Sequence, residues 1–545
     1  MIQNYSHTYN LDQRTNIRLL NQSEDQPAIT ECDLIADSGQ IDDIQPETPL
    51  LNDKVQQHMQ QAISSYLKSN LEIDPAITFT PISTTKIETL ECKTSAVFHY
   101  RSEKEFENFI KENPSLDMLT IIYWPPNKYT GEKFNLSAVT ELKHLKNLLI
   151  TNNSSIYEHA PEQLKEQVLQ ELFTLPSLPQ LESLGIINII PNDQDEKLSV
   201  TLMEHVALQC PNLKGLNVYD IVHFRQYNRL LPGIEKLQNL EELSLPHNIF
   251  TDFNQTNFDK LRLLPHLRVL NIPFTCIAAD QRDLLMDQIF SIPSLEVVDL
   301  SLFNFRDYYT LNFSQLDHSY PNIKSLNLSK NTINNLDAAH LFPHLAQLNL
   351  SNCNLTQMQC QDLAKFTQLK ELSLANCTVK QENKEQLSWI VMPNLKHLNL
   401  SQFSAHGFDI SHLAPNLIEL NLSQTNITSG DIKNLTPLNQ LEKLNISQSK
   451  ISETSIKFIS NLKNMRSLDM SQTILKQADF TPLAQLQQLK EINLDQTTLS
   501  VQSFLSLGAL TQLETLSIRN LNNDNITPAY VAQLQAALPN TKILF

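Results

Sequence analysis

The chain has 545 residues, more than one compact core usually serves, so it forms either several domains or one repetitive body. Its 59 acidic and 41 basic residues give a net charge of −18, which argues against a surface for nucleic acid or anionic membranes. Eight glycines leave little supply for Gly-rich phosphate loops. Seven scattered cysteines without a CxxC pair indicate free thiols in a reducing compartment.

The N-terminal part carries no repeat. Residues 1–50 hold nine acidic and two basic residues without a clear period, which predicts a flexible acidic segment. Residues 51–86 begin with LNDKVQQHMQQAISSYLKSN, whose apolar residues fall on one helical face, and this predicts a helical N-terminal cap. Its polar face is mostly Gln and Ser, which disfavours a membrane-surface helix. With no apolar signal region and no run of 18 apolar residues, we expect no cleaved signal and no stable membrane insertion.

A phrase of the form L-x-x-L-x-L-x-x-N-x-L then recurs about sixteen times over residues 87–526, at spacings of 22 to 36 residues. Its clear examples include LEELSLPHNIF from Leu240 and LIELNLSQTNI from Leu417, weaker ones start at Leu116 and Leu181, and a doubtful one starts at Ile87. We number the positions of this phrase from its first leucine. The L-x-L alternation predicts a short strand, and stacking neighbouring strands about 4.8 Å apart in a parallel sheet buries the leucines.

The segments between the phrases, such as 430–440 and 455–464, have helical spacing and predict short helices on the other side of the sheet. Helices are wider than strands, so the stack must curve with the strands on its concave side. Residues 527–545 predict a C-terminal cap, with one helix and a final strand at 542–545. The predicted fold class is an α/β solenoid, a right-handed curved horseshoe with a parallel concave sheet and short convex helices.

These repeats resemble the leucine-rich repeat family. The resemblance covers roughly residues 87–545, and more than a dozen phrases in series make it specific. Position 9 lies where the chain turns out of the strand, so small residues there point inward and bond to backbone groups. Cys353 and Cys377 both occupy position 9, so we interpret them as pattern residues and not as a reactive pair or a metal site.

No HExxH, GxSxG, P-loop, GxGxxG or paired-cysteine motif occurs, so the sequence predicts no catalytic residue, cofactor or metal site. From Ile323 onward, positions 5 and 7 of the phrase are mostly Asn and Ser, and five repeats have Gln at position 8. These polar columns suit a solvated sheet surface, although a long polar ladder also has the means to bind a partner. The N-terminal half instead places aromatic and apolar residues at outward positions, and such residues carry protein–protein contacts. The candidate protein-binding residues are Ile122, Tyr123, Tyr219, His247, Phe274 and Leu302.

The predicted function is a non-enzymatic scaffold that binds one or more partner proteins on its concave surface. The repeats, the scarce Gly and the Asn, Gln, Lys and Ile richness resemble leucine-rich repeat effectors of intracellular bacterial pathogens. That resemblance implies an effector that reaches the host cytosol by a non-Sec route and binds a host protein there. The alternative is a substrate-recruiting adaptor of a ubiquitin-ligase-type complex, with residues 1–86 docking to the ligase. The partner's identity and the oligomeric state stay open.

Overall fold

The computed structural model of the chain describes residues 95–100, 102–123, 135–152, 175–187, 198–219, 233–246, 249–250, 259–273, 276–277, 282–303, 310–380, 391–403, 409–522 and 525–545. All of them belong to one compact unit that spans Ala76–Phe545. The segments predicted at 1–50 and 51–86 lie outside the described residues.

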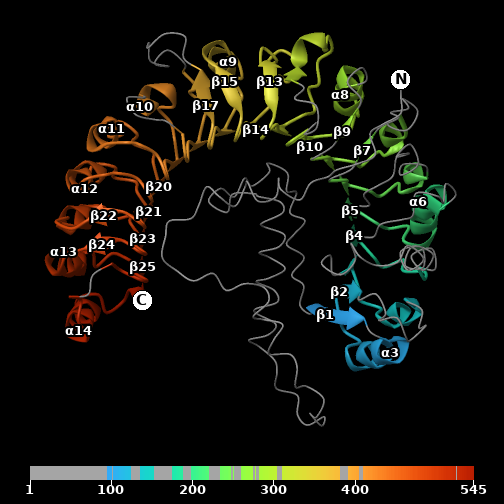
Figure 1. Cartoon of the computed structure of the whole chain (residues 1–545), viewed down its shortest axis with the longest axis horizontal. Helices are drawn as coiled ribbons and strands as arrows, with labels where there is room; N and C mark the ends of the chain where they lie inside the picture. Colours follow the sequence, from blue (N-terminus) through green and yellow to red (C-terminus); the bar gives the residue numbers. More distant parts are fainter. Residues whose placement is uncertain are drawn as a thin grey trace, which may run out of the picture. The chain divides into compact units, whose positions relative to one another are not determined.

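The unit is built on one sheet of 18 parallel strands, and each strand pairs with the next one along the chain (Figure 1). In spatial order the strands are β1 (Ser95–Tyr100), β2 (Met118–Tyr123), β3 (Asn147–Asn152), β4 (Ser183–Ile187), β5 (Gly215–Tyr219), β6 (Glu242–Ser244), β8 (Val269–Asn271), β10 (Val297–Asp299), β12 (Ser325–Asn327), β14 (Gln347–Asn349), β16 (Glu371–Ser373), β18 (His397–Asn399), β19 (Glu419–Asn421), β20 (Lys443–Asn445), β21 (Ser467–Asp469), β23 (Glu491–Asn493), β25 (Thr515–Ser517) and β26 (Lys542–Leu544). The strands run side by side along the inner edge of the curved stack, as the sequence predicted.

The helices that the structure describes all lie on the outer side of this sheet (Figure 1). The α-helices are α3 (Glu103–Glu112), α6 (Leu198–Gln209), α8 (Arg282–Phe290), α9 (Gln357–Leu363), α10 (Ile410–Leu413), α11 (Ser429–Asn434), α12 (Thr454–Ile459), α13 (Val501–Ser506) and α14 (Pro528–Ala537). Other repeats have 3₁₀ helices in this place: η3 (Ser137–Glu141), η5 (Ile234–Lys236), η6 (Lys260–Leu263), η8 (Phe313–Gln315) and η9 (Thr481–Gln485), while η10 (Leu507–Ala509) directly follows α13. None of the described helices is long and apolar enough to cross a membrane.

Some repeats add a short second strand beyond the turn that ends the inner strand. These strands form four small parallel pairs, β7 (Ile249–Phe250) with β9 (Cys276–Ile277), β11 (Thr310–Asn312) with β13 (Thr332–Asn335), β15 (Asn354–Thr356) with β17 (Thr378–Lys380), and β22 (Ile474–Leu475) with β24 (Thr498–Leu499). In β11, β13 and β15 a buried apolar residue stands between polar ones, so one side of these strands faces the core.

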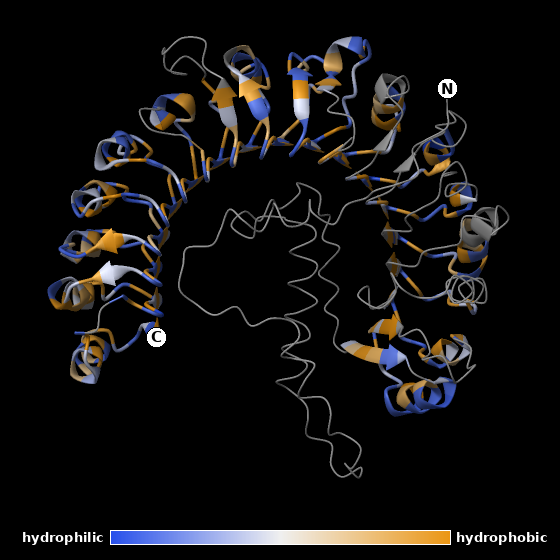
Figure 2. Cartoon of the chain, in the orientation of Figure 1, coloured by the Kyte–Doolittle hydropathy of each residue, from blue (hydrophilic) through white to orange (hydrophobic). Residues whose placement is uncertain are grey.

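The core consists of the leucines at positions 1, 4 and 6 of every repeat. Leu441, Leu444 and Ile446 in one repeat are at most 2% exposed, and their counterparts are buried alike except in the end strands β1 and β26, where they are less buried. Figure 2 shows the resulting alternation of hydrophobic and hydrophilic residues along the strands. No strand can bury its leucines alone, so each repeat depends on its neighbours for stability.

The sequence predicted sixteen of the 18 strands from their phrases, as well as the cap helix α14 and the final strand β26. The first strand is the exception. β1 pairs Ser95 with Met118 and Tyr100 with Tyr123, so the first strand among the described residues is 95–100. Most of the phrase that starts at Ile87 lies outside the described residues. KTSAVFHY lacks a leucine at positions 4 and 6 and uses Ala96 and Phe98 instead, which is why the template missed it.

Candidate functional site on the concave sheet face

The concave face consists of the side chains at positions 3, 5 and 7, which alternate with the buried positions 4 and 6. Strand register keeps equal positions in line from repeat to repeat. Glu371, His397, Glu419 and Lys443, for example, are successive partners at position 3 of β16, β18, β19 and β20. Each row of this face therefore runs across the strands with one side chain about every 4.8 Å.

Position 5 has a structural task that the sequence analysis did not recognise. In eight repeats its Asn or Asp oxygen accepts a hydrogen bond from the backbone N–H of position 7, at 2.8–3.0 Å. This Asx turn ends the strand after three residues. The recurring spacing Asn-x-Ser was the available signal.

The polar columns are therefore less solvated than predicted. Ser373, Asn399 and Ser401 are only 1–3% exposed, whereas Asn327, Asn349 and Asn445, which make the same turn as Asn399, are half-buried. The prediction of a solvated sheet surface at positions 5 and 7 is wrong for this stretch of the face.

Position 8 lies just past the strand end, in left-handed backbone. Ten residues there have φ between 48° and 61°, a region that residues other than glycine rarely adopt. The backbone N–H of Gln448 donates to the carbonyl of Ser471 in the next repeat at 3.0 Å, and the other members repeat this bond. The five predicted glutamines are exposed, but at the edge of the sheet and not on the strands.

Position 9 points inward, as predicted, and bonds to backbone carbonyls. Asn331 donates from Nδ2 to Leu300 and Leu328 at 2.8 and 2.9 Å. The Cys377 thiol donates to the carbonyl of Leu350 at 2.9 Å, and burial raises its pKa to about 12. These inward side chains bond to backbone carbonyls at the point where the chain leaves each strand. Together with the parallel sheet of L-x-L strands, they identify the fold.

The chain folds as a leucine-rich repeat protein. No protein-family model matches the sequence, and neither does any curated protein. Solved structures of similar fold include an internalin (InlF) from Listeria monocytogenes, with 22% identity and a TM-score of 0.42, covering 57% of this chain and 82% of that one. Another is the TLR13–ssRNA13 complex, with 17% identity and a TM-score of 0.47, covering 82% of this chain and 76% of that one.

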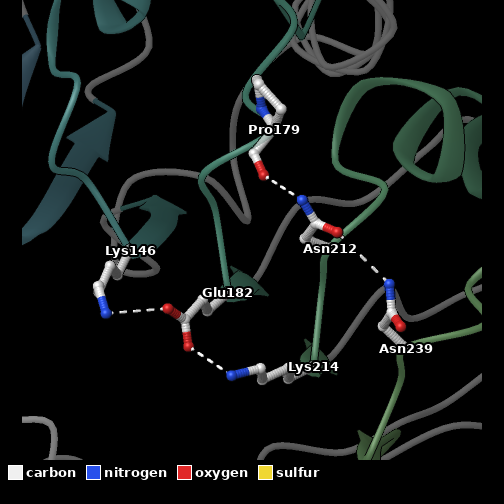
Figure 3. Close-up of polar contacts among 6 residues, drawn as sticks. All are labelled: Lys146, Pro179, Glu182, Asn212, Lys214 and Asn239. Atoms are coloured by element: carbon white, nitrogen blue, oxygen red, sulfur yellow. Dashed lines mark hydrogen bonds and ion pairs between the residues drawn. The ribbon is translucent and has the colours of Figure 1, made fainter.

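Position 2 forms a charged rim beside the concave face of the leucine-rich repeats. Figure 3 shows Glu182 between Lys146 and Lys214, with N–O distances of 3.0 and 2.9 Å. Burial opposes ionisation of Glu182, but the hydrogen bonds from both lysines outweigh it and lower the pKa of its carboxyl. Glu296 lies between Arg268 and Lys324 in the same way. Each of these rim glutamates is thus paired with two cations.

A second structural ladder precedes position 1. Asn212 donates to the carbonyl of Pro179 at 2.8 Å and lies beside Asn239, which donates to the carbonyl of Pro211 at 3.0 Å (Figure 3). Asn322 and Asn416 repeat the contact with Pro293 and Pro393. Both polar ladders are therefore part of the scaffold.

The centre of the concave face carries a charged row at position 3. Glu419 contacts Nδ1 of His397 at 3.2 Å and Nζ of Lys443 at 2.5 Å. The hydrogen bond from His397 is the main cause that lowers the pKa of Glu419 to about 2, and the same bond raises the pKa of His397. Next to them, burial raises the pKa of Glu371. The sequence analysis missed this row because it compared positions 5, 7 and 8 and not position 3.

The predicted binding residues divide between described and undescribed parts. Ile122, half-buried, and Tyr219 share one row at position 7, joined through Thr151 and Ile187. Tyr123 follows at position 8 of β2, and Leu302 lies in the left-handed turn after β10 with φ 48°. His247 and Phe274 lie outside the described residues. Binding by these six residues stays a prediction.

Proposed function

We propose that the chain is a protein-binding scaffold that recognises its partner with the concave face of its sheet. The observation that carries this proposal is the one-sided cover of the sheet, since every described helix packs on its outer side (Figure 1). Parallel sheets normally have both faces covered, and no helix in the described part of the chain covers the concave face, which leaves it available to a partner. Register-aligned rows on a fully hydrogen-bonded backbone give that face a fixed spacing and little need to rearrange.

Two regions of the face differ in chemistry. The row through Ile122 and Tyr219 is apolar and aromatic, while the row through Glu371 and Glu419 is charged. Such a division suits a protein surface, which offers both apolar anchors and charged groups, better than it suits a small molecule.

The proposal includes a bacterial effector role in a reducing host cytosol. Its support is the resemblance of the repeats and the state of the position 9 thiols, since Cys353 and Cys377 donate hydrogen bonds through their S–H groups. A reporter fusion that fails to enter host cells during infection would contradict the effector role without affecting the scaffold role.

The test is capture of host proteins by the full chain, read by mass spectrometry. Ile122→Trp, Ser325→Trp and Glu491→Trp each place a bulky ring at a different point of the concave face, on β2, β12 and β23. Lys457→Trp on α12 is the matched control, because Lys457 is exposed on the helical side. We expect at least one concave variant to lose a partner that the control retains.

A partner that Lys457→Trp loses while all three concave variants keep it would contradict the concave assignment. Capture of a ligase component that all four variants retain would instead favour the adaptor alternative.

A further inference from the structure

The concave face carries seven carboxylates at positions 3, 5 and 7. They are Glu242, Asp299, Glu371, Glu419, Asp469, Glu491 and Asp495. Among the described residues only Glu419 has a cation within 4 Å. The rim glutamates Glu182 and Glu296, in contrast, each hold two cations. The face therefore has an excess of negative charge that the described part of the chain does not neutralise.

Glu371 is the carboxylate of this set whose neighbours most clearly indicate a binding site for a cation. It lies on β16, between Gln347 of β14 and His397 of β18 in the same row. The His397 ring is directed to Glu419 on its other side, at 3.2 Å, and Lys443 lies beyond Glu419. The two nearest basic groups of the row are thus engaged by one glutamate. Glu371 has a hydrogen bond with Gln347 but no cation within 4 Å among the described residues, so its charge can still pair with a cation from a partner.

Two buried polar atoms on neighbouring strands independently indicate a ligand. Nδ2 of Asn421, on β19, and the hydroxyl of Ser401, two residues beyond β18, have no hydrogen-bond partner in the described structure. Asn421 is 7% and Ser401 3% exposed. Equivalent asparagines use this atom, since Nδ2 of Asn327 donates to Asp299 at 2.9 Å and Nδ2 of Asn493 to Asp469 at 3.0 Å. A buried donor left unpaired is costly, and a partner's carbonyl oxygen would satisfy it.

We propose that strands β16, β18, β19 and β20 bind an extended basic segment of the partner protein, with a Lys or Arg on Glu371 and a backbone carbonyl on Asn421. This inference rests on the proposed scaffold function and names the chemistry of its ligand. Asn421 is two strands from Glu371 and two residues farther along, which places it roughly 12 Å away. About four extended residues cover that distance, so one short segment reaches both groups.

Residues 1–50 of the chain itself do not fit this surface. They carry nine acidic and two basic residues, and like charges oppose their docking on a face rich in carboxylates. The charge of residues 1–50 thus disfavours them as the ligand, and the proposal assigns the basic segment to another protein.

The test measures binding of fluorescein-labelled peptides of about twelve residues to the full chain by fluorescence anisotropy, at about 150 mM salt to screen long-range attraction. The peptides alternate Ser with Lys, Glu or Asn. Glu371→Gln removes the carboxylate, and Gln347 shows that this row accommodates Gln. Asn421→Ser removes the amide donor, and Ser373 and Ser517 occupy the same position in other repeats. Glu112→Gln, exposed on α3, changes the net charge equally and serves as the control.

We expect the Lys-Ser peptide to bind, Glu371→Gln to weaken it about tenfold, Asn421→Ser to weaken it about threefold or more, and Glu112→Gln to change it less than about twofold. Circular dichroism confirms that each variant is folded. Equal losses for Glu371→Gln and Glu112→Gln would reduce the effect to net charge and overturn the proposal.

Failure of the proposal can be told from failure of the scaffold function. If the Glu-Ser or Asn-Ser peptide binds in its place, or if no peptide binds while Ser325→Trp still abolishes capture of a host protein, the basic segment is wrong and the scaffold stands. If no peptide binds and no concave variant affects capture, both are wrong.

Discussion

The first five strands are longer than the later strands of the same sheet. In most of the later repeats the side chain at position 5 accounts for this difference. β1 to β5 have five or six residues, whereas every later strand of the sheet has three. The long strands carry Val97, Thr120, Leu149, Gly185 and Asn217 at position 5, and the later ones mostly Asn or Asp. In eight later repeats an Asx turn captures the N–H of position 7 and the chain leaves the sheet. β6 and β8 also end after three residues, and there position 7 is Pro246 or Pro273, which has no N–H to pair.

Asn217 marks the boundary between the two regions. It has the residue type of the later repeats but lies in a long strand, and its Oδ1 is buried without a hydrogen-bond partner in the described structure. Gly185, beside it, leaves room for Leu149, whose Cδ1 lies 2.6 Å from where a Cβ on residue 185 would be. Packing of side chains across the long strands thus replaces the hydrogen bonds of the later turns.

The largest effect should be common to both regions, because both bury the same leucines. Leu148→Ala in β3 and Leu444→Ala in β20 each remove a side chain that is 2% exposed, and each should lower the free energy of unfolding by about 2–5 kcal/mol. Urea denaturation measures both, and Leu263→Ala, at 59% exposure, is the control. A small loss for Leu148→Ala alone would show that the long-stranded region is packed differently.

The next largest effect should be a difference in stability between valine substitutions at position 8 of the two regions. Gln448→Val puts a β-branched residue at φ 54° and should cost about 1–2 kcal/mol, while Gln448→Gly should cost little. Asn152→Val, at position 8 of β3, lies in a strand and should be tolerated. Thermal unfolding of the three variants checks this, and equal losses for the two valines would contradict the difference in backbone.

The same substitution at position 5 should have opposite signs in the two regions. Asn445→Ala loses the 2.9 Å bond to the N–H of Ser447 and should cost about 1 kcal/mol. Asn217→Ala removes a buried oxygen without a partner and should cost nothing or stabilise the chain. Chemical denaturation of the pair decides, and a clear loss for Asn217→Ala would mean that its oxygen has a partner after all.

The smallest effect concerns the charged row. His397 titrates above its usual 6.5 and Glu419 below its usual 4.5, so their pair stabilises the fold most between these pH values. This contribution fades as rising pH deprotonates His397 and as falling pH protonates Glu419. The exposed pair should contribute less than about 1 kcal/mol. Glu419→Gln should lower the pKa of His397 in an NMR titration, and Glu491→Gln should not; an unchanged pKa in Glu419→Gln would contradict the contact.

The sequence predicted most strands of this fold because the spacing of the leucines indicates which residues are buried. The same positions are buried in nearly all of the repeats. It did not predict the Asx turns or the position of β1, because those depend on hydrogen bonds and on Ala96 and Phe98 taking the place of leucines. The residues of the charged row at Glu371 can be read from the sequence, but only strand register shows that they are neighbours. Which of its charges are paired depends on side-chain directions that spacing does not encode.

The sheet's bonding pattern has a mechanical consequence. The carbonyl of Glu442 accepts the N–H groups of both Arg466 and Ser467, and corresponding residues repeat this fork from one repeat to the next. These bonds join consecutive repeats in series, so a force that pulls on the two ends of the unit loads every fork alike. Under tension the stack should peel from an end, one repeat of about 24 residues at a time, each rupture releasing roughly 80 Å of chain. The protein would then extend in a series of small steps, the most even of them in the later repeats, and not in a single break.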